Sequence, residues 1–114
     1  MVVISIQIGR TGGRAYIGPS SQTTAPPIGW VKLGHELIFA HEVGHLFGCH
    51  HNREVMPGGG SSNEFSYGYL MKGSKMRTTM AYPATDFPRW IPAFSSNDLN
   101  YKEVSLGNSK NDNR

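Results

Sequence analysis

Residues 41–51 read His41-Glu42-Val43-Gly44-His45-Leu46-Phe47-Gly48-Cys49-His50-His51, which is the pattern H-E-x-x-H-x-x-G-x-x-H. On an α-helix, residues four apart lie one above the other on the same face, so His41 and His45 can direct their ring nitrogens at one metal ion. Glu42 is about 100° further round such a helix. Its carboxylate cannot be a ligand on that face, but it can reach a water beside the metal. The stretch therefore predicts a helix that carries two metal ligands and one acid–base group.

Gly48 predicts where a third ligand comes from. A continuing helix would carry residue 51 away from the ion, but glycine adopts the left-handed conformation at little cost and is the usual residue just past a helix end. If the chain reverses at Gly48, His51 approaches the metal from a loop. Three protein ligands leave a fourth position open for water, which is the arrangement of a catalytic zinc site.

Two other interpretations of this stretch use the same histidines. The first is a polar helix with histidines on its surface, and the five fixed positions of the pattern argue against it. The second concerns His50 and His51, which are neighbours and could each bind. The spacing from Gly48 selects His51, which leaves His50 as a residue that supports a ligand or faces solvent.

The extended motif resembles that of the metzincin clan of zinc endopeptidases, and two later segments strengthen the resemblance. Metzincins carry a tight turn that contains methionine, the Met-turn, downstream of the zinc helix. The segment Arg77-Thr78-Thr79-Met80-Ala81-Tyr82 resembles this turn, with Met80 as its methionine. The segment Arg89-Trp90-Ile91-Pro92-Ala93-Phe94-Ser95-Ser96 resembles the R-I-P-x-F-S stretch of reprolysin-like members. The resemblance runs from about Gly13 to the C-terminus.

This resemblance implies a zinc-dependent endopeptidase that acts on a protein or peptide substrate. Zn²⁺ would be held by His41, His45 and His51 and would lower the pKa of its bound water toward about 7. Glu42 would act as the general base that takes the proton of this water, positions the water for attack on a peptide carbonyl, and passes the proton to the leaving nitrogen. The resemblance also implies an extracellular location.

Two residues, Tyr82 and Asn52, can be compared with the patterns of individual metzincin subfamilies. Tyr82 follows Met80 at the spacing M-x-Y of astacin-like and serralysin-like enzymes, in which the tyrosine hydroxyl contacts the zinc or the reaction intermediate. It is equally consistent with a packed aromatic side chain whose hydroxyl bonds to backbone. The residue after the third histidine is often Asp in reprolysins and Glu in astacins, and here it is Asn52. The subfamily therefore stays open.

The length of the chain limits the fold. A chain of 114 residues forms at most one domain, residues 1–114. A metzincin catalytic domain is longer and has several strands and a long helix before the zinc helix, whereas only 40 residues precede His41 here. We therefore expect part of a metzincin-like α+β domain. It should consist of a short mixed sheet packed on one long zinc-binding helix, followed by a largely irregular C-terminal part with a Met-turn.

Periodicity and turn residues predict the individual elements. The elements expected outside the zinc motif are strands at Met1–Ile8, Arg14–Gly18, Trp30–Leu33 and Phe65–Met71, a turn from Gly9 to Gly13, and loops at Pro19–Pro27 and Asn52–Asn63. The zinc helix is expected from about Gly34 to Phe47, and the polar chain after Phe94 is expected to be irregular. The stretch from Gly13 to Tyr16 is comparable to the metzincin edge strand, and an unpaired edge can accept an extended peptide by strand addition.

Composition argues against several other classes of protein. The net charge of +3 comes from scattered Lys and Arg residues, with no basic stripe or nucleic-acid motif. No segment approaches the roughly 20 apolar residues of a membrane span, and the first residues lack the features of a signal peptide. The single cysteine, Cys49, cannot form an internal disulfide. It is a residue whose pairing partner is absent, a small buried residue, or a soft zinc ligand, and its place between Gly48 and His50 does not suit the last role.

Two rival functions share the motif. One is a catalytically inactive zinc-binding remnant that lacks the N-terminal elements of a substrate cleft. The other is a binding module in which the histidines serve structure. Structural zinc sites usually have four protein ligands, and the fourth would have to be Cys49 or Tyr82. An assay of the purified protein with and without a chelator separates both from an endopeptidase. The sequence does not reveal the cleavage preference or the oligomeric state.

Overall fold

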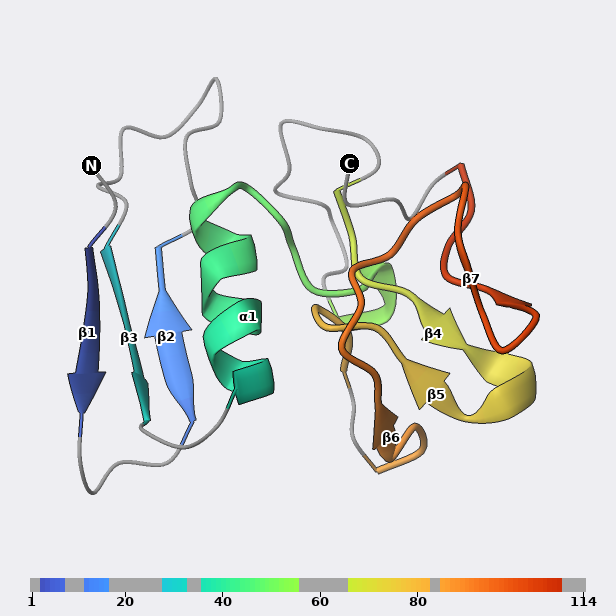
Figure 1. The fold of residues 1–114 in the computed structure, drawn as a ribbon, viewed down its shortest axis with the longest axis horizontal. Helices are drawn as coiled ribbons and strands as arrows, with labels where there is room; N and C mark the ends of the chain where they lie inside the picture. Colours follow the sequence, from blue (N-terminus) through green and yellow to red (C-terminus); the bar gives the residue numbers. More distant parts are fainter. Residues whose placement is uncertain are drawn as a thin grey trace. The chain divides into compact units, whose positions relative to one another are not determined.

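The structure is a computed structural model in which two compact units follow one another along the chain, residues 1–49 and residues 50–114. The residues that it describes are 3–7, 12–16, 28–32, 36–55, 66–82 and 85–109. Each unit has its own strands (Figure 1). The expectation of a single domain over residues 1–114 stays a prediction.

The first unit contains the predicted mixed sheet. Its strands are β1 (Val3–Gln7), β2 (Gly13–Ala15) and β3 (Ile28–Lys32), in the order β1-β3-β2. β1 runs parallel to β3, and β2 runs antiparallel to it. β3 begins two residues earlier than predicted, because Ile28 and Gly29 pair with Val3 and Ile4 of the neighbouring strand. The predicted loop from Pro19 to Pro27 lies outside the described residues.

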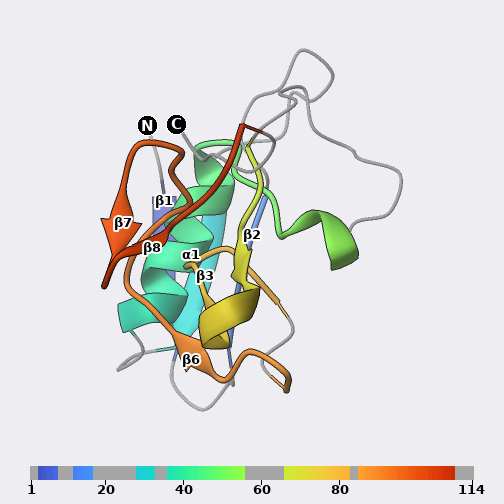
Figure 2. The ribbon, with the colours of Figure 1, turned by 90° about the vertical axis from the view of Figure 1, so that its right-hand side faces the viewer.

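One helix, α1 (Glu36–Leu46), packs against β2 and β3 (Figures 1 and 2). The prediction of one helix on a small mixed sheet is thus confirmed, while the expected first helical residues, 34 and 35, lie outside the described part. The helix ends in two hydrogen bonds, from the amide of Gly48 to the His45 carbonyl and from the amide of Cys49 to the Gly44 carbonyl, both 2.9 Å. Gly48 has a φ of 89°. This is the Schellman arrangement, in which a left-handed glycine reverses the chain.

The second unit is built on short elements. Its main sheet contains β4 (Leu70–Met71), β5 (Met76–Arg77) and β6 (Arg89–Trp90), with β4 antiparallel and β6 parallel to β5. Two 3₁₀ turns, η1 (Arg53–Val55) and η2 (Lys72–Ser74), lie before β4 and between β4 and β5. The expected strand at Phe65–Met71 is therefore limited to Leu70–Met71 among its described residues, and η1 interrupts the expected loop at Asn52–Asn63. A small core of Met71, Met76, Ile91 and Leu106 stabilises the unit.

The expectation that the chain after Phe94 is irregular is wrong for residues 100–105. There, β7 (Asn100–Tyr101) and β8 (Val104–Ser105) form an antiparallel hairpin. Its two turn residues, Lys102 and Glu103, have φ values of 48° and 66°. A two-residue turn of this kind favours Asn and Gly, because both central residues need positive φ. Lys and Glu give no such signal, so the hairpin could not be recognised from the local sequence.

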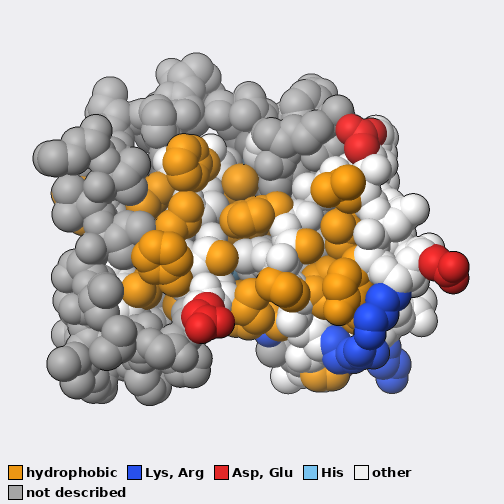
Figure 3. Space-filling view, in the orientation of Figure 1, with side chains coloured by type: hydrophobic (Ala, Val, Ile, Leu, Met, Phe, Trp, Pro, Cys, Tyr) orange, Lys and Arg blue, Asp and Glu red, His pale blue; other side chains and the backbone are white. Residues whose placement is uncertain are grey.

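Figure 3 shows apolar side chains at several separate places on one face of the molecule. The large hydrophobic residues that are exposed in the described part of the chain are Tyr16, Ile28, Phe39, Phe47, Val55, Tyr82, Phe94 and Leu99. Scattered exposed apolar residues are normal on protein surfaces and indicate no binding surface by themselves. Within the described residues, no helix has the length and apolar character needed to cross a bilayer.

Candidate metal centre

Two histidines project from one face of α1. His41 and His45 are both buried, and their ring centroids lie 4.8 Å apart with the ring planes nearly perpendicular. The spacing of four residues places one ring a helical turn above the other, as predicted. Buried imidazoles so close together are well placed to share one ion.

A backbone carbonyl orients the second of these rings. Nδ1 of His45 lies 2.8 Å from the carbonyl oxygen of Cys49. Because a carbonyl can only accept, Nδ1 must carry the proton, and Nε2 keeps its lone pair for a metal. Histidine ligands commonly donate their other N–H in this way, which fixes both the tautomer and the ring orientation. The same chain reversal that ends the helix therefore supplies the acceptor.

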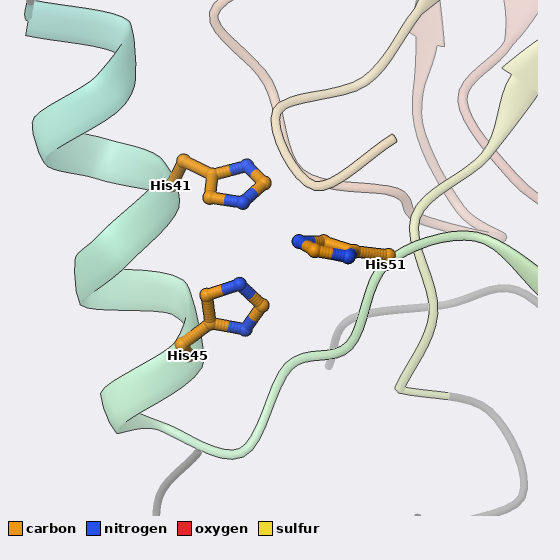
Figure 4. A group of neighbouring side chains, drawn as sticks. All are labelled: His41, His45 and His51. Carbon is orange, nitrogen blue, oxygen red and sulfur yellow. The ribbon is translucent and has the colours of Figure 1, made fainter. Parts of the chain in front are cut away.

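The reversal at Gly48 also brings in the third predicted histidine. His41, His45 and His51 each offer one ligand atom, and these atoms all lie within 4.8 Å of one another (Figure 4). A tetrahedral zinc ion, at about 2.0–2.1 Å from each nitrogen, would hold ligand atoms roughly 3.4 Å apart. The ligand atoms would have to approach one another to reach this separation when an ion binds. The donor set and its spacing fit a zinc ion with three protein ligands, and the assignment of the three residues as ligands stays a prediction.

Glu42 lies between the two helical histidines in the sequence and is 5% exposed. Its Oε2 atom has no hydrogen-bond partner among the described residues. Burial raises the pKa of the Glu42 carboxyl to about 7, and the positive charge of Arg14 opposes this rise. A buried carboxyl group with a free oxygen and a pKa near neutrality has the properties expected of a general base.

His50, the neighbour of the third predicted ligand, does not face solvent. It is 4% exposed. Its amide donates to the carbonyl of Ser66 at 2.8 Å, and its carbonyl accepts from the amide of Gly68 at 3.1 Å. Its ring lies tilted against Tyr67, with the centroids 5.7 Å apart, and burial lowers the pKa of its imidazole. His50 is therefore held in the second unit by its backbone, and it is not one of the three clustered histidines.

Asn52 has a role that the sequence analysis missed. It is completely buried, and both polar groups of its side-chain amide form hydrogen bonds. The Nδ2 group donates to Oε2 of Glu54 at 2.8 Å, and the Oδ1 atom accepts from the amide of Tyr82 at 2.7 Å. The local sequence gave no signal of this role, because one of the two partners lies thirty residues away in the chain.

Tyr82 lies beside His51. Its ring contacts the imidazole edge-on, with centroids 4.8 Å apart, and the side chain is 38% exposed. The tyrosine is thus neither fully packed nor remote from the predicted ligands.

Met80 occupies a tight turn. The amide of Ala81 donates to the carbonyl of Thr78 at 3.0 Å, and Met80 between them is fully buried. Gly68 lies against this turn, since a Cβ atom on it would be 2.7 Å from the Met80 carbonyl carbon. The segment resembling the Met-turn is therefore a buried turn that needs a glycine beside it.

The loop after Met80 is held by Arg77, which is a second residue whose role the sequence analysis missed. Its Nε donates to the carbonyl of Phe87 at 3.0 Å, and its Nη1 donates to the carbonyl of Ala81 at 2.9 Å. The guanidinium also lies 4.4 Å from the centre of the Trp90 ring. The planar fork of arginine can bind two carbonyls at once, so it ties the two ends of this loop together.

Cys49 does not take part in the metal cluster of the described residues. It is a buried free thiol, and burial raises the pKa of this thiol to about 11. Of the three expected roles, that of a small buried residue agrees best with these properties.

Comparisons with known proteins agree with the geometry. The family described as metallo-peptidase family M12B, reprolysin-like, matches residues 14–112. A peptidyl-Asp metalloendopeptidase of Xanthomonas campestris is 30% identical over 94 residues, which cover 82% of this chain and 22% of that protein. A peptidyl-Asp metalloendopeptidase of Stenotrophomonas maltophilia is 28% identical over 96 residues, covering 80% of this chain and 22% of that protein.

The two matches cover most of this chain but only a small part of each relative. The chain spans about a fifth of the length of the two curated relatives. No solved structure matches it significantly.

Proposed function

Because this chain belongs to the reprolysin-like metallopeptidases of family M12B, we propose that it is a zinc-dependent endopeptidase whose metal is held by His41, His45 and His51. The observation that carries the proposal is the convergence of these three side chains, with ligand atoms within 4.8 Å. The bond from His45 to the Cys49 carbonyl supports it, because it prepares one ring for metal binding.

The chemistry divides between the metal and Glu42. A zinc ion in this position would acidify a coordinated water and polarise the scissile carbonyl. Glu42 accepts the proton of the attacking water and delivers it to the leaving nitrogen. Its burial supports this role, since a carboxyl group with a pKa near 7 can both take and return a proton at neutral pH.

Tyr82 and Met80 have supporting roles in the proposal. We propose that the Tyr82 hydroxyl assists at the reacting carbonyl. The partial exposure of Tyr82 and the contact of its ring with His51 support this role. Met80 takes no chemical step and forms the buried turn of a metzincin Met-turn. The strand β2 has β3 on one side and is an edge of its described sheet, which supports binding of an extended peptide by strand addition.

The substrate preference is proposed from the relatives. Two proteins named as peptidyl-Asp metalloendopeptidases match most of this chain, and we propose cleavage next to aspartate. Two otherwise identical peptides, one with Asp and one with Asn at a single position, test this directly. Equal rates of cleavage of the two peptides would exclude the preference while leaving the endopeptidase activity intact. The extracellular location implied by the resemblance is a further proposal.

The decisive experiment measures casein cleavage by the purified chain with zinc and with a chelator. Activity that the chelator abolishes and zinc restores supports the endopeptidase. Zinc bound at one ion per chain without cleavage would favour an inactive zinc-binding remnant instead. Glu42→Gln should keep zinc and lose about 10²–10⁴-fold in kcat. Glu36→Gln on the exposed first turn of the same helix is the matched control and should leave kcat unchanged.

A further inference from the structure

Gly13 stands opposite Glu42 in the first unit. It is the first residue of β2 and pairs with Val31 of β3. An ideal Cβ atom built on Gly13 would lie 2.7 Å from Cγ and 2.8 Å from Oε1 of Glu42, and 2.9 Å from Cγ2 of Ile38. Such separations are well inside van der Waals contact, which is about 3.5–4.0 Å between carbon atoms. No other residue type fits there while Glu42 keeps its position.

The backbone at Gly13 gives no other reason for glycine. The described glycines with positive φ are Gly12 and Gly48, and Gly13 is not among them. Its conformation is that of an ordinary strand, which any residue can adopt. Glycine inside a strand usually weakens it and often marks a place where another group approaches closely. Here the group that approaches is a carboxylate.

Of the two side chains that crowd Gly13, Glu42 is the one able to move. Ile38 is β-branched, and its χ1 angle is nearly fixed in a helix. Glu42 is unbranched, and its Oε2 atom has no hydrogen-bond partner among the described residues to hold it in place. A methyl group at position 13 would therefore push the carboxylate aside rather than the helix.

We propose that Gly13 is a positioning residue, whose missing side chain provides the space in which the Glu42 carboxylate stands beside the metal site. This inference rests on the proposed role of Glu42 as general base. The three atoms nearest to a Cβ at position 13 belong to Glu42 and Ile38, so we expect a substitution there to affect proton transfer rather than zinc binding.

The kinetic test compares Gly13→Ala with two other glycine variants. Gly13→Ala should lower kcat by about 10–100-fold, since a displacement of 1 Å can cost a catalytic group about 10² in rate, with zinc content and KM near wild type. Gly29→Ala crowds Ala15 and the Arg14 carbonyl in the same sheet, and should lower stability without this loss of kcat. A Cβ atom at Gly73 meets no atom within 4 Å, so Gly73→Ala should change neither the stability nor kcat. A Gly13→Ala enzyme with wild-type kcat would overturn the proposal.

A second readout is independent of activity. The melting temperature of the Gly13→Ala protein should fall by about 5–15 °C, because an added methyl group overpacks this contact. This loss should largely disappear in a Glu42→Ala background, where Cγ and Oε1 are absent. It should persist in an Ile38→Ala background. The opposite pattern would show that Gly13 serves the helix contact through Ile38, and would overturn the proposal.

The two experiments separate this inference from the proposed function. If the wild-type chain shows no chelator-sensitive cleavage, the proposed function fails, while the coupling of Gly13 to Glu42 is still decided by the melting temperatures. If the chain cleaves casein and Glu42→Gln abolishes cleavage, the proposed function stands. In that case, an absence of coupling between positions 13 and 42 would refute the inference about Gly13 and leave the proposed function unaffected.

Discussion

The amide of Tyr82 donates a hydrogen bond of 2.7 Å to the side-chain oxygen of Asn52, thirty residues earlier in the chain. Asn52 directly follows His51, and Tyr82 stands two residues after Met80. The bond therefore joins the loop of the third predicted ligand to the turn that contains Met80. The ring of Tyr82 also contacts the ring of His51, so the side chain of the buried Asn52 and the ring contact both connect these two segments.

Replacing Asn52 by Ala should reduce both stability and activity. The Tyr82 amide would lose its acceptor at a partly buried position, which costs about 1 kcal/mol. Urea unfolding measures this cost, and zinc content and kcat measure the effect on the site. Asn52→Asp keeps an acceptor for Tyr82 and should retain more activity than Asn52→Ala, although it loses the bond donated to Glu54. Asn100→Ala, at an exposed position, is the control. Equal activity of the Ala and Asp variants would show that the bond does not position Tyr82.

The two neighbouring histidines should respond differently to substitution. His51→Ala removes a predicted ligand, so its zinc affinity should fall by more than the 10–100-fold that is typical for a residue supporting a ligand. His50→Ala should keep zinc but lower the free energy of unfolding by about 1–3 kcal/mol, because a buried ring and its contact with Tyr67 are lost. Competition with a zinc-binding dye measures the zinc affinity of each variant, and thermal unfolding measures its stability. The reverse order of zinc affinities would assign the third ligand to His50.

The metal-free protein should lose stability as pH rises through the titration of Glu42. Its pKa is raised from 4.5 to about 7, so the folded state holds this proton more tightly than the unfolded chain. The stabilising effect of the proton is complete below about pH 4.5 and is lost by about pH 7, a change of about 1–3 kcal/mol. Glu42→Gln cannot titrate, and its stability should exceed that of wild type above pH 7.

The titration of His50 changes the free energy of unfolding in the opposite direction. This contribution cancels when wild type is compared with Glu42→Gln. Burial lowers its pKa from 6.5, so its contribution is present above that pH and is lost as pH falls. Both proteins contain His50, and subtracting their curves of unfolding free energy against pH isolates Glu42. Parallel curves between pH 4.5 and 7 would show that the carboxyl group is not perturbed in the folded protein.

The Cys49 thiol should be nearly inert in the folded protein. Burial raises its pKa from 9.0 to about 11, which lowers the thiolate fraction at pH 8 by roughly a hundredfold. Labelling with iodoacetamide should therefore be slow in buffer and fast in urea. Rapid labelling of the folded protein would contradict the burial of this side chain.

Local sequence was enough for the elements whose signal lies in a few adjacent residues. The helix follows from the spacing of its histidines, and its end follows from Gly48, because only a left-handed residue can close the observed turn. The mixed sheet follows in outline from short β-type segments. The hairpin at residues 100–105 was missed because its turn residues, Lys102 and Glu103, adopt positive φ without being Asn or Gly. Pairing between the two strands outweighs their local preference.

The sequence by itself determined the chemistry available to this protein: three imidazoles and one carboxylate at spacings that a helix and a reversing glycine can bring to one metal. Only the tertiary structure decided how these groups are held. The carbonyl that orients His45, the space that Gly13 leaves for Glu42, the amide of Asn52 that bonds Tyr82, and the two carbonyls bound by Arg77 all join parts of the chain by packing or hydrogen bonding. Contacts of this kind depend on distances between folded segments, and a pattern of residue types along one chain does not contain those distances.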